Sequence, residues 1–168
     1  RSESCAAIML CQEHTVSGDR NLLSLFGSAV RQDGRSASLT APNGQAQEGL
    51  LMAALQDAGT SVDTLAINEA HGTGTALGDP IEVGSLVAVV FLARKGPLAM
   101  GGVKANIAHA ELAAGMTGLL KLALSKHHDR AQPNAQLRLL NPHVSVTMHG
   151  AACVLPTQVA ALLDAETM

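Results

Sequence analysis

The chain has 168 residues, of which 47% are hydrophobic and 15% charged, and its formal net charge is -3. This composition is sufficient for one hydrophobic core and excludes a disordered chain. The small negative charge, the lack of a Lys/Arg block and the presence of only two aromatic residues argue against nucleic acid as a partner.

Apolar runs and cysteines bear on where in the cell the protein is expected. The longest apolar run, 83–93, is interrupted by Gly84 and Ser85 and is too short to cross a bilayer, so we expect a buried helix and no membrane span. The three cysteines, an odd number without CxxC spacing, predict neither a disulfide framework nor a zinc site. A reducing, cytoplasmic setting fits this usage best.

The first third of the chain predicts a hairpin, a loop and a helix. Apolar runs at 4–11 and 22–30, joined by a polar turn at 13–21, indicate two paired strands. The segment 31–45 is rich in Gly, Ser, Asn and Pro and indicates a long loop, and long ordered loops often serve a site. From Ala46 apolar residues recur at helical spacing until Gly59, which predicts a helix that covers a sheet.

A histidine turn lies at the centre of the sequence. The run 62–70 predicts an inner strand, Gly72 and Gly74 allow a sharp turn, and Asp79-Pro80 marks the start of a helix that extends to about residue 94. His71 is therefore expected at the carboxyl end of a strand, where ligands bind in open α/β sheets. A hydrogen-bonded turn histidine without a chemical role is the alternative. No lysine follows the glycines, so a phosphate loop is disfavoured.

A second unit repeats this plan. It consists of a strand at 98–103, then Lys104, Asn106 and His109, then a helix at 110–127. Gly115 and Gly118 cost roughly 1 kcal/mol each within a helix, which suggests close packing there. Further on, 144–148 alternates as an edge strand does, and an Ala/Leu-rich tail follows at 158–165. Alternating strands and helices predict an α/β layered fold.

The two histidines predict a site for a negatively charged oxygen. The positive end of a helix behind His109 favours a neutral imidazole, which donates one hydrogen bond. Two such donors, from His71 and His109, would stabilise an oxyanion. Lys104 holds a carboxylate, sets the electrostatics or is a surface lysine. A metal site of His71, Asp79 and His109 is disfavoured because no pair has i, i+4 spacing. His127, His128 and His143 are expected to face solvent.

Two long motifs carry a family resemblance. His-Gly-Thr-Gly-Thr-Ala-Leu-Gly-Asp-Pro-Ile-Glu at 71–82 and Gly-Val-Lys-Ala-Asn-Ile-Ala-His-Ala-Glu-Leu-Ala-Ala-Gly at 102–115 resemble the β-ketoacyl synthases, most closely the ketosynthase domains of modular type I polyketide synthases. The loop at 27–44 and Asn141-Pro142-His143 also match, so the resemblance extends to about residue 143.

The resemblance implies a thiolase-like layered α/β fold, of which this chain is about one half. Residues 1–45 would be the end of the N-terminal half with its connecting loop, and 46–168 an incomplete C-terminal half. The implied reaction is a decarboxylative Claisen condensation of an acyl thioester with a malonyl-type unit on acyl carrier protein, in polyketide or fatty acid biosynthesis. Implied partners are acyl carrier protein, the rest of the ketosynthase and neighbouring synthase domains, and the complete enzyme is expected to be a homodimer.

The resemblance also assigns roles to residues. His71, His109 and Lys104 match the catalytic set, Asp79, Glu82 and Asn106 are supporting residues, and Thr73 and Thr75 match threonines that contact the phosphopantetheine arm. No cofactor or metal is expected to bind directly, since phosphopantetheine belongs to the carrier protein.

Some family features are missing or changed. The nucleophilic cysteine normally lies in a small-residue turn, a context that Cys5, Cys11 and Cys153 lack, and the closing Phe-Gly-Gly-Thr-Asn segment is absent. The chain is thus expected to be part of a ketosynthase and inactive alone. A degenerate piece with a structural or carrier-binding role, or a decarboxylase or thiolase, is the alternative. Ala108 stands where the family has glycine.

Overall fold

The computed structural model describes residues 2–12, 23–36, 38, 41–135 and 137–162. A three-stranded parallel sheet has the order β1-β2-β4, with β1 at Ile67–Glu69, β2 at Leu98–Gly101 and β4 at Cys153–Val154. A second, antiparallel pair joins β3 (Arg130–Ala131) to β5 (Ala160–Ala161). The helices are α1 (Gly44–Asp57), α2 (Gly78–Leu86), α3 (Lys104–Ile107), α4 (Ala114–His127) and α5 (Pro142–Thr147), with short helices η2 (Val62–Thr64), η3 (Val87–Phe91) and η4 (Glu111–Ala113).

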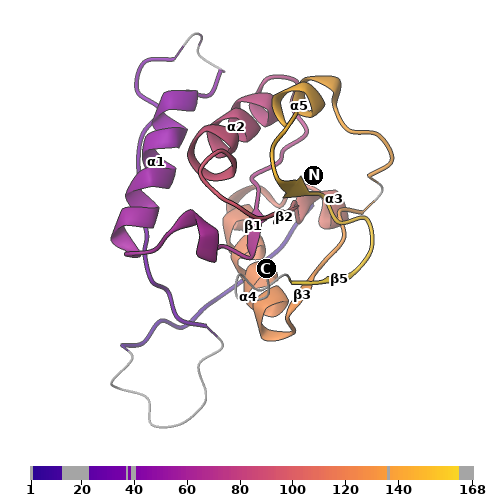
Figure 1. Ribbon diagram of the computed structural model, residues 1–168. Coiled ribbons are helices and arrows are strands. Elements are labelled where there is room, and N and C mark those ends of the chain that lie inside the picture. Colours follow the sequence, from indigo (N-terminus) through magenta and orange to yellow (C-terminus); the bar gives the residue numbers. More distant parts are fainter. Residues whose placement is uncertain (1, 13–22, 37, 39–40, 136, 163–168) are drawn as a thin grey trace.

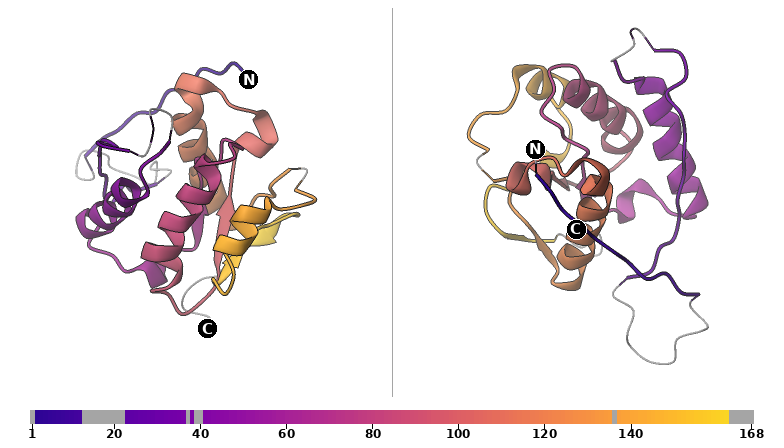
Figure 2. Two further views of the ribbon diagram at one scale, coloured as in Figure 1. Left: turned by 90° about the horizontal axis from the view of Figure 1, so that it is seen from above. Right: turned by 180° about the vertical axis from the view of Figure 1, so that it is seen from behind.

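The helices cover both faces of the parallel sheet. Helices α2 and α5 lie on one face and α4 lies on the other, while α1 packs beside α2 at the outside (Figure 1; Figure 2 shows α2 and α5 from above). Because β2 is the central strand, Leu98 is fully buried and Met100 is 6% exposed. The layered α/β architecture predicted from the sequence is confirmed.

The core joins one side of α2 to the central strand. Burying a side chain of this size stabilises a fold by about 1.5–3 kcal/mol, so these contacts hold the layers together. The buried members are Val83, Leu86, Val90, Phe91, Leu98, Met100 and Val144. No helix within the described ranges is long and apolar enough to cross a membrane.

The predicted hairpin at 4–11 and 22–30 is wrong for the residues that the structure describes, 2–12 and 23–36, which contain no strand. Segment 23–31 instead runs along α1 (Figure 1). The backbone N–H of Ser28 donates to Asp57 at 2.8 Å, and a Cβ on Gly27 would lie 2.5 Å from the nitrogen of Ala58. Contact with a helix thus replaces strand pairing. The predicted turn at 13–21 lies outside the described residues.

The predicted strand at 62–70 is confirmed only as Ile67–Glu69. Ser61 caps η2 by accepting from the N–H of Asp63 at 3.3 Å, and the guanidinium of Arg94 donates to the carbonyls of Val62 (2.8 Å) and Leu65 (3.0 Å). The Arg94 side chain therefore satisfies carbonyls that would otherwise accept hydrogen bonds from a neighbouring strand.

The predicted edge strand at 144–148 is also wrong, because α5 occupies it. Asn141 accepts from the N–H of His143 at 2.9 Å, and Pro142 stands at the first helical position, two strong signals for a helix start. The predicted helices are found at 46–58 as α1, at 80–94 as α2 and η3 up to Phe91, and at 110–127 as η4 followed by α4. The expectation that the first of them covers a sheet is wrong, because α1 packs on α2. The strand predicted at 98–103 ends at Gly101, and the described residues of the predicted loop form no helix or strand before Gly44.

Candidate functional site

His71 emerges directly beyond the end of the parallel sheet. Glu69 pairs with Gly101 at the last register position, and the N–H of Ala70 donates to the carbonyl of Gly101 at 2.8 Å. Strands β1 and β2 therefore stay hydrogen-bonded up to the residue before His71. This confirms the predicted position of the histidine at the carboxyl edge, where ligands bind in open α/β sheets.

Two carboxylates hold the turn that follows His71. Glu82 on α2 accepts from the backbone N–H groups of His71 (2.6 Å) and Gly72 (2.9 Å), and Asp79 accepts from Gly74 at 3.1 Å. Gly72 and Gly74 have φ values of 48° and 76°, a region that favours glycine. Both acidic residues thus act on the backbone of the turn, which fixes where the imidazole projects.

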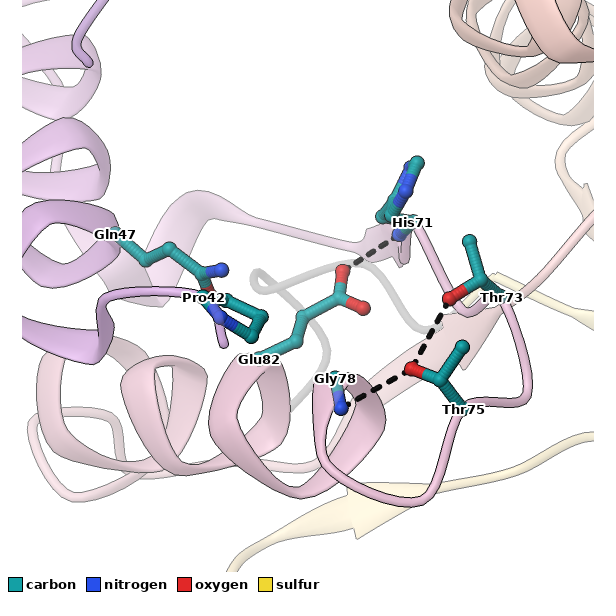
Figure 3. A pocket seen from close by; sticks show the side chains of 7 residues that line it. All are labelled: Pro42, Gln47, His71, Thr73, Thr75, Gly78 and Glu82. Carbon is teal, nitrogen blue, oxygen red and sulfur yellow. Dashed lines mark hydrogen bonds between the residues drawn. The ribbon is translucent and has the colours of Figure 1, made fainter. Parts of the chain in front are cut away.

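The same turn forms one wall of a cavity of about 230 Å³ (Figure 3). Thr75 accepts from the N–H of Gly78 at 3.1 Å, and its hydroxyl lies 3.5 Å from that of Thr73. Figure 3 shows Pro42, just before α1, and Gln47, in the first turn of α1, across from these threonines. Sequence reasoning missed both, although the long loop at 31–45 was expected to serve a site. The lining residues are Pro42, Gln47, His71, Thr73, Thr75, Gly78 and Glu82.

Lys104 connects the two motif turns, which are the turn at 70–78 after β1 and the turn at 102–109 after β2. It begins α3, a short helix just beyond β2, and its Nζ donates a hydrogen bond to the backbone carbonyl of His71. The lysine contacts a backbone oxygen here, and no contact with a carboxylate, the first of the three roles considered from the sequence, is seen among the described residues. Asn106 on the same helix faces another way: its amide donates to the carbonyl of Pro133 (3.2 Å) and accepts from Ala135 (3.3 Å). Asn106 therefore ties α3 to the 133–135 segment.

A backbone group orients His109. Its Nδ1 accepts from the N–H of Glu111 at 2.8 Å, so the ring proton of the neutral imidazole lies on Nε2, which is left as a donor. His109 was expected at the positive end of a long helix. This is wrong in detail, because α4 begins only at Ala114 and the ring accepts from a single peptide N–H. Ala108, just before it, has φ 62° and ψ -175°, a conformation almost confined to glycine.

The two histidines come together although 38 positions separate them in the sequence (109 − 71). Their ring centroids lie 5.9 Å apart at an interplanar angle of 89°. The two rings therefore lie edge to face, in a T-shaped arrangement. His127, His128 and His143 are exposed, as predicted. Within the described ranges, no group of three or more His, Cys, Asp and Glu side chains is arranged to hold a metal ion.

The cysteines differ in environment. Burial raises the pKa of the Cys153 thiol from 9.0 to about 11, which makes it a poor nucleophile at neutral pH. Cys5 and Cys11 are exposed, in the extended segment before the first helix. Among the residues that the structure describes, no cysteine lines the cavity beside His71.

Fold and site together define an α/β protein with two histidines and a lysine at the carboxyl ends of adjacent parallel strands. Residues 22–138 match the family described as beta-ketoacyl synthase, C-terminal domain. The chain belongs to this family, and the resemblance inferred from its motifs is confirmed.

Curated relatives are polyketide synthases. The chain is 46% identical to a phenolphthiocerol/phthiocerol polyketide synthase polypeptide of Mycobacterium tuberculosis, over 77% of this chain and 7% of the relative. It is 42% identical to erythronolide synthase EryA2 of Saccharopolyspora erythraea, over 85% of this chain and 4% of the relative. The chain thus spans a small part of the length of these relatives.

A solved structure confirms the thiolase-like fold. The oxazolomycin ketosynthase domain OzmH KS7 of Streptomyces albus JA3453 has a TM-score of 0.79 and 36% identity, with 86% of this chain and 25% of that chain covered.

Proposed function

We propose that this chain supplies the histidine and lysine part of a condensing site in polyketide or fatty acid biosynthesis. The site joins an acyl thioester to a malonyl-type unit on acyl carrier protein by decarboxylative Claisen condensation. The observation that carries the proposal is the approach of His71 and His109 to 5.9 Å between ring centroids, with Lys104 bound to the His71 carbonyl. Family membership supports it over a non-catalytic role.

The chemistry requires donors for a developing negative charge. Loss of carbon dioxide from the malonyl thioester breaks a carbon–carbon bond, and the electron pair moves onto the thioester oxygen as an enolate. His109 offers its Nε2–H to this oxygen because Nδ1 is already an acceptor, and His71 offers a second N–H. The enolate carbon then attacks the acyl thioester, and the cysteine thiolate leaves. Each donor is worth about 3–4 kcal/mol of transition-state stabilisation in comparable sites.

The acyl-holding cysteine belongs, in this proposal, to sequence outside these residues. Cys153 has a raised pKa, and Cys5 lies exposed in an extended segment. The chain alone is then inactive, and acyl carrier protein, the remaining ketosynthase and neighbouring domains complete the system in the cytoplasm, as a homodimer. The division at residue 45 is part of the proposal, supported by the lack of helix and strand in 23–36 and the start of α1 at Gly44.

Thr73 and Thr75 are proposed to contact the phosphopantetheine arm of the carrier. Their hydroxyls lie in the wall of the cavity beside His71, and the arm's amides are partners for such hydroxyls. The arm is a substrate carrier here, so no resident cofactor is required.

A hybrid enzyme tests the function. Residues 44–162 replace the matching segment of the oxazolomycin ketosynthase KS7, and condensation product is measured with its own acyl and malonyl carriers. We expect product from the hybrid and a loss of roughly 10²–10³-fold in kcat for His71→Ala. His143→Ala, an exposed histidine outside the site, is the control and should retain activity. A folded hybrid without product, or near-normal turnover of His71→Ala, would refute the proposal.

A further inference from the structure

The geometry points to Glu69 and Lys121 as a buried positioning pair that sets the places of His71 and Lys104. Neither residue was singled out by its sequence motif, and neither contacts the cavity described above. Any consequence for catalysis rests on the proposed condensation, whereas the structural consequence stands apart from it.

The pair is shielded from water. Lys121 Nζ on α4 lies 2.8 Å from Glu69 Oε2 at the end of β1, and the side chains are 9% and 5% exposed. Buried ion pairs seldom stabilise a fold more than apolar side chains of the same size would. A pair in this position therefore calls for a role other than stability alone.

Glu69 also reaches the second motif turn. Its Oε1 accepts the backbone N–H of Val103, the residue immediately before Lys104. Lys104 in turn donates to the carbonyl of His71, two residues beyond Glu69. These contacts form a closed ring between the ends of β1 and β2. Lys121 holds the carboxylate in this ring from the side of α4, so the spacing of His71 and Lys104 depends on it.

Two glycines make room for the pair. A Cβ on Gly101 would lie 2.6 Å from Lys121 Nζ and 2.9 Å from Glu69 Oε2, and a Cβ on Gly118 would lie 3.4 Å from Glu69 Cγ. The close packing predicted around the helix glycines is thus confirmed at Gly118. At Gly115 it is wrong, because nothing lies within 4 Å of a Cβ there. The missing side chains of Gly101 and Gly118 thus leave the space that the Glu69 carboxylate and the Lys121 ammonium fill.

The same helix supplies a matched control. Lys126 and Asp129 also form an ion pair, at 3.2 Å, but their side chains are 60% and 69% exposed. This pair lies at the far end of α4 and touches neither motif turn. Its removal leaves the contacts around Glu69 intact.

The experiment uses the hybrid ketosynthase with two readouts. One is the rate of reductive methylation of Lys104, measured by mass spectrometry, which requires no turnover. The other is kcat and KM for the malonyl carrier. The test variant combines Glu69→Gln with Lys121→Met, which removes both charges and keeps side-chain size. Asp129→Asn is the control.

We expect faster methylation of Lys104 in the double variant, because the ring that holds it is weakened. We expect kcat to fall by roughly tenfold to 100-fold, as small misplacements of reacting groups do, with KM unchanged. The control should match the parent in both readouts. A folded double variant with unchanged methylation of Lys104, or with unchanged kcat in an active hybrid, would overturn the inference.

Two further outcomes are also decisive. If the double variant does not fold, Gly101→Ala displaces the pair without removing a charge and is judged by the same readouts. If the parent hybrid makes no product, the proposed function fails. The methylation rate then decides the inference alone: a faster rate supports the positioning pair and an unchanged rate refutes it.

Discussion

The backbone N–H of Glu111 donates to Nδ1 of His109 at 2.8 Å, which leaves Nε2 as the donor of the neutral ring. The consequence is that His109 acts by donating a hydrogen bond, and a side chain that offers an N–H at the same place should replace part of its function.

Substitution His109→Gln tests this role. The glutamine amide can place an N–H near the position of Nε2, so we expect it to retain more condensation activity than His109→Ala. Loss of one such donor costs about 3 kcal/mol in transition-state stabilisation, so the alanine variant should lose at least 100-fold in kcat. The measurement is kcat in the hybrid ketosynthase. Equal activity of the glutamine and alanine variants would argue for a role other than hydrogen-bond donation.

Ala108→Gly should stabilise the protein. Ala108 has φ 62° and ψ -175°, a conformation that costs a residue with a Cβ about 1–3 kcal/mol. Glycine removes this strain but is more flexible when unfolded, so the expected net gain is about 1 kcal/mol. Urea unfolding measures it. Ala105→Gly in the helix α3 is the control and should lose roughly 1 kcal/mol. A loss of stability in Ala108→Gly would contradict this backbone conformation.

Lys121→Met should destabilise the fold strongly. It leaves the carboxylate of Glu69, which is 5% exposed, without its cation, and uncompensated buried charges of this kind cost about 3–5 kcal/mol. Adding Glu69→Gln should recover most of the loss. Lys126→Met, which breaks the exposed pair with Asp129, should change the unfolding free energy by less than about 1 kcal/mol. Equal effects of the two lysine substitutions would show that Glu69 does not depend on Lys121.

Cys153 should make stability fall at alkaline pH. Burial raises its pKa to about 11 from 9.0, so the folded state keeps the proton that the unfolded state loses above pH 9. The stability contributed by the buried neutral thiol is complete below pH 9 and is lost as the pH rises through about 11.

Alkylation gives a direct measurement of this thiol. At pH 8, iodoacetamide should modify Cys5, which is exposed, faster than Cys153, and urea should abolish the difference. In parallel, Cys153→Ala should flatten the fall in unfolding free energy between pH 9 and 11. Equal alkylation rates in the folded protein would mean that Cys153 is not shielded.

Local sequence determined the features that depend on a few neighbouring residues. Helical spacing from Ala46 to Gly59 predicted α1, because one apolar face is set by the helix period. The motifs identified the family and placed His71 at the end of a strand, since glycines with positive φ and the Asp79-Pro80 pair are local signals. The same motifs named Lys104 and His109 as members of one site.

Only the tertiary structure decided which surfaces meet. The apolar run at 22–30 had the pattern of a strand, but its described part packs against α1 at Gly27 and Ser28. Glu69 and Lys121 are 52 residues apart, and no local period connects them. Their pairing depends on how α4 lies on the sheet and on the space beside Gly101 and Gly118. Burial and long-range hydrogen bonds are properties of the assembled layers, which is why they are absent from the pattern of any single segment.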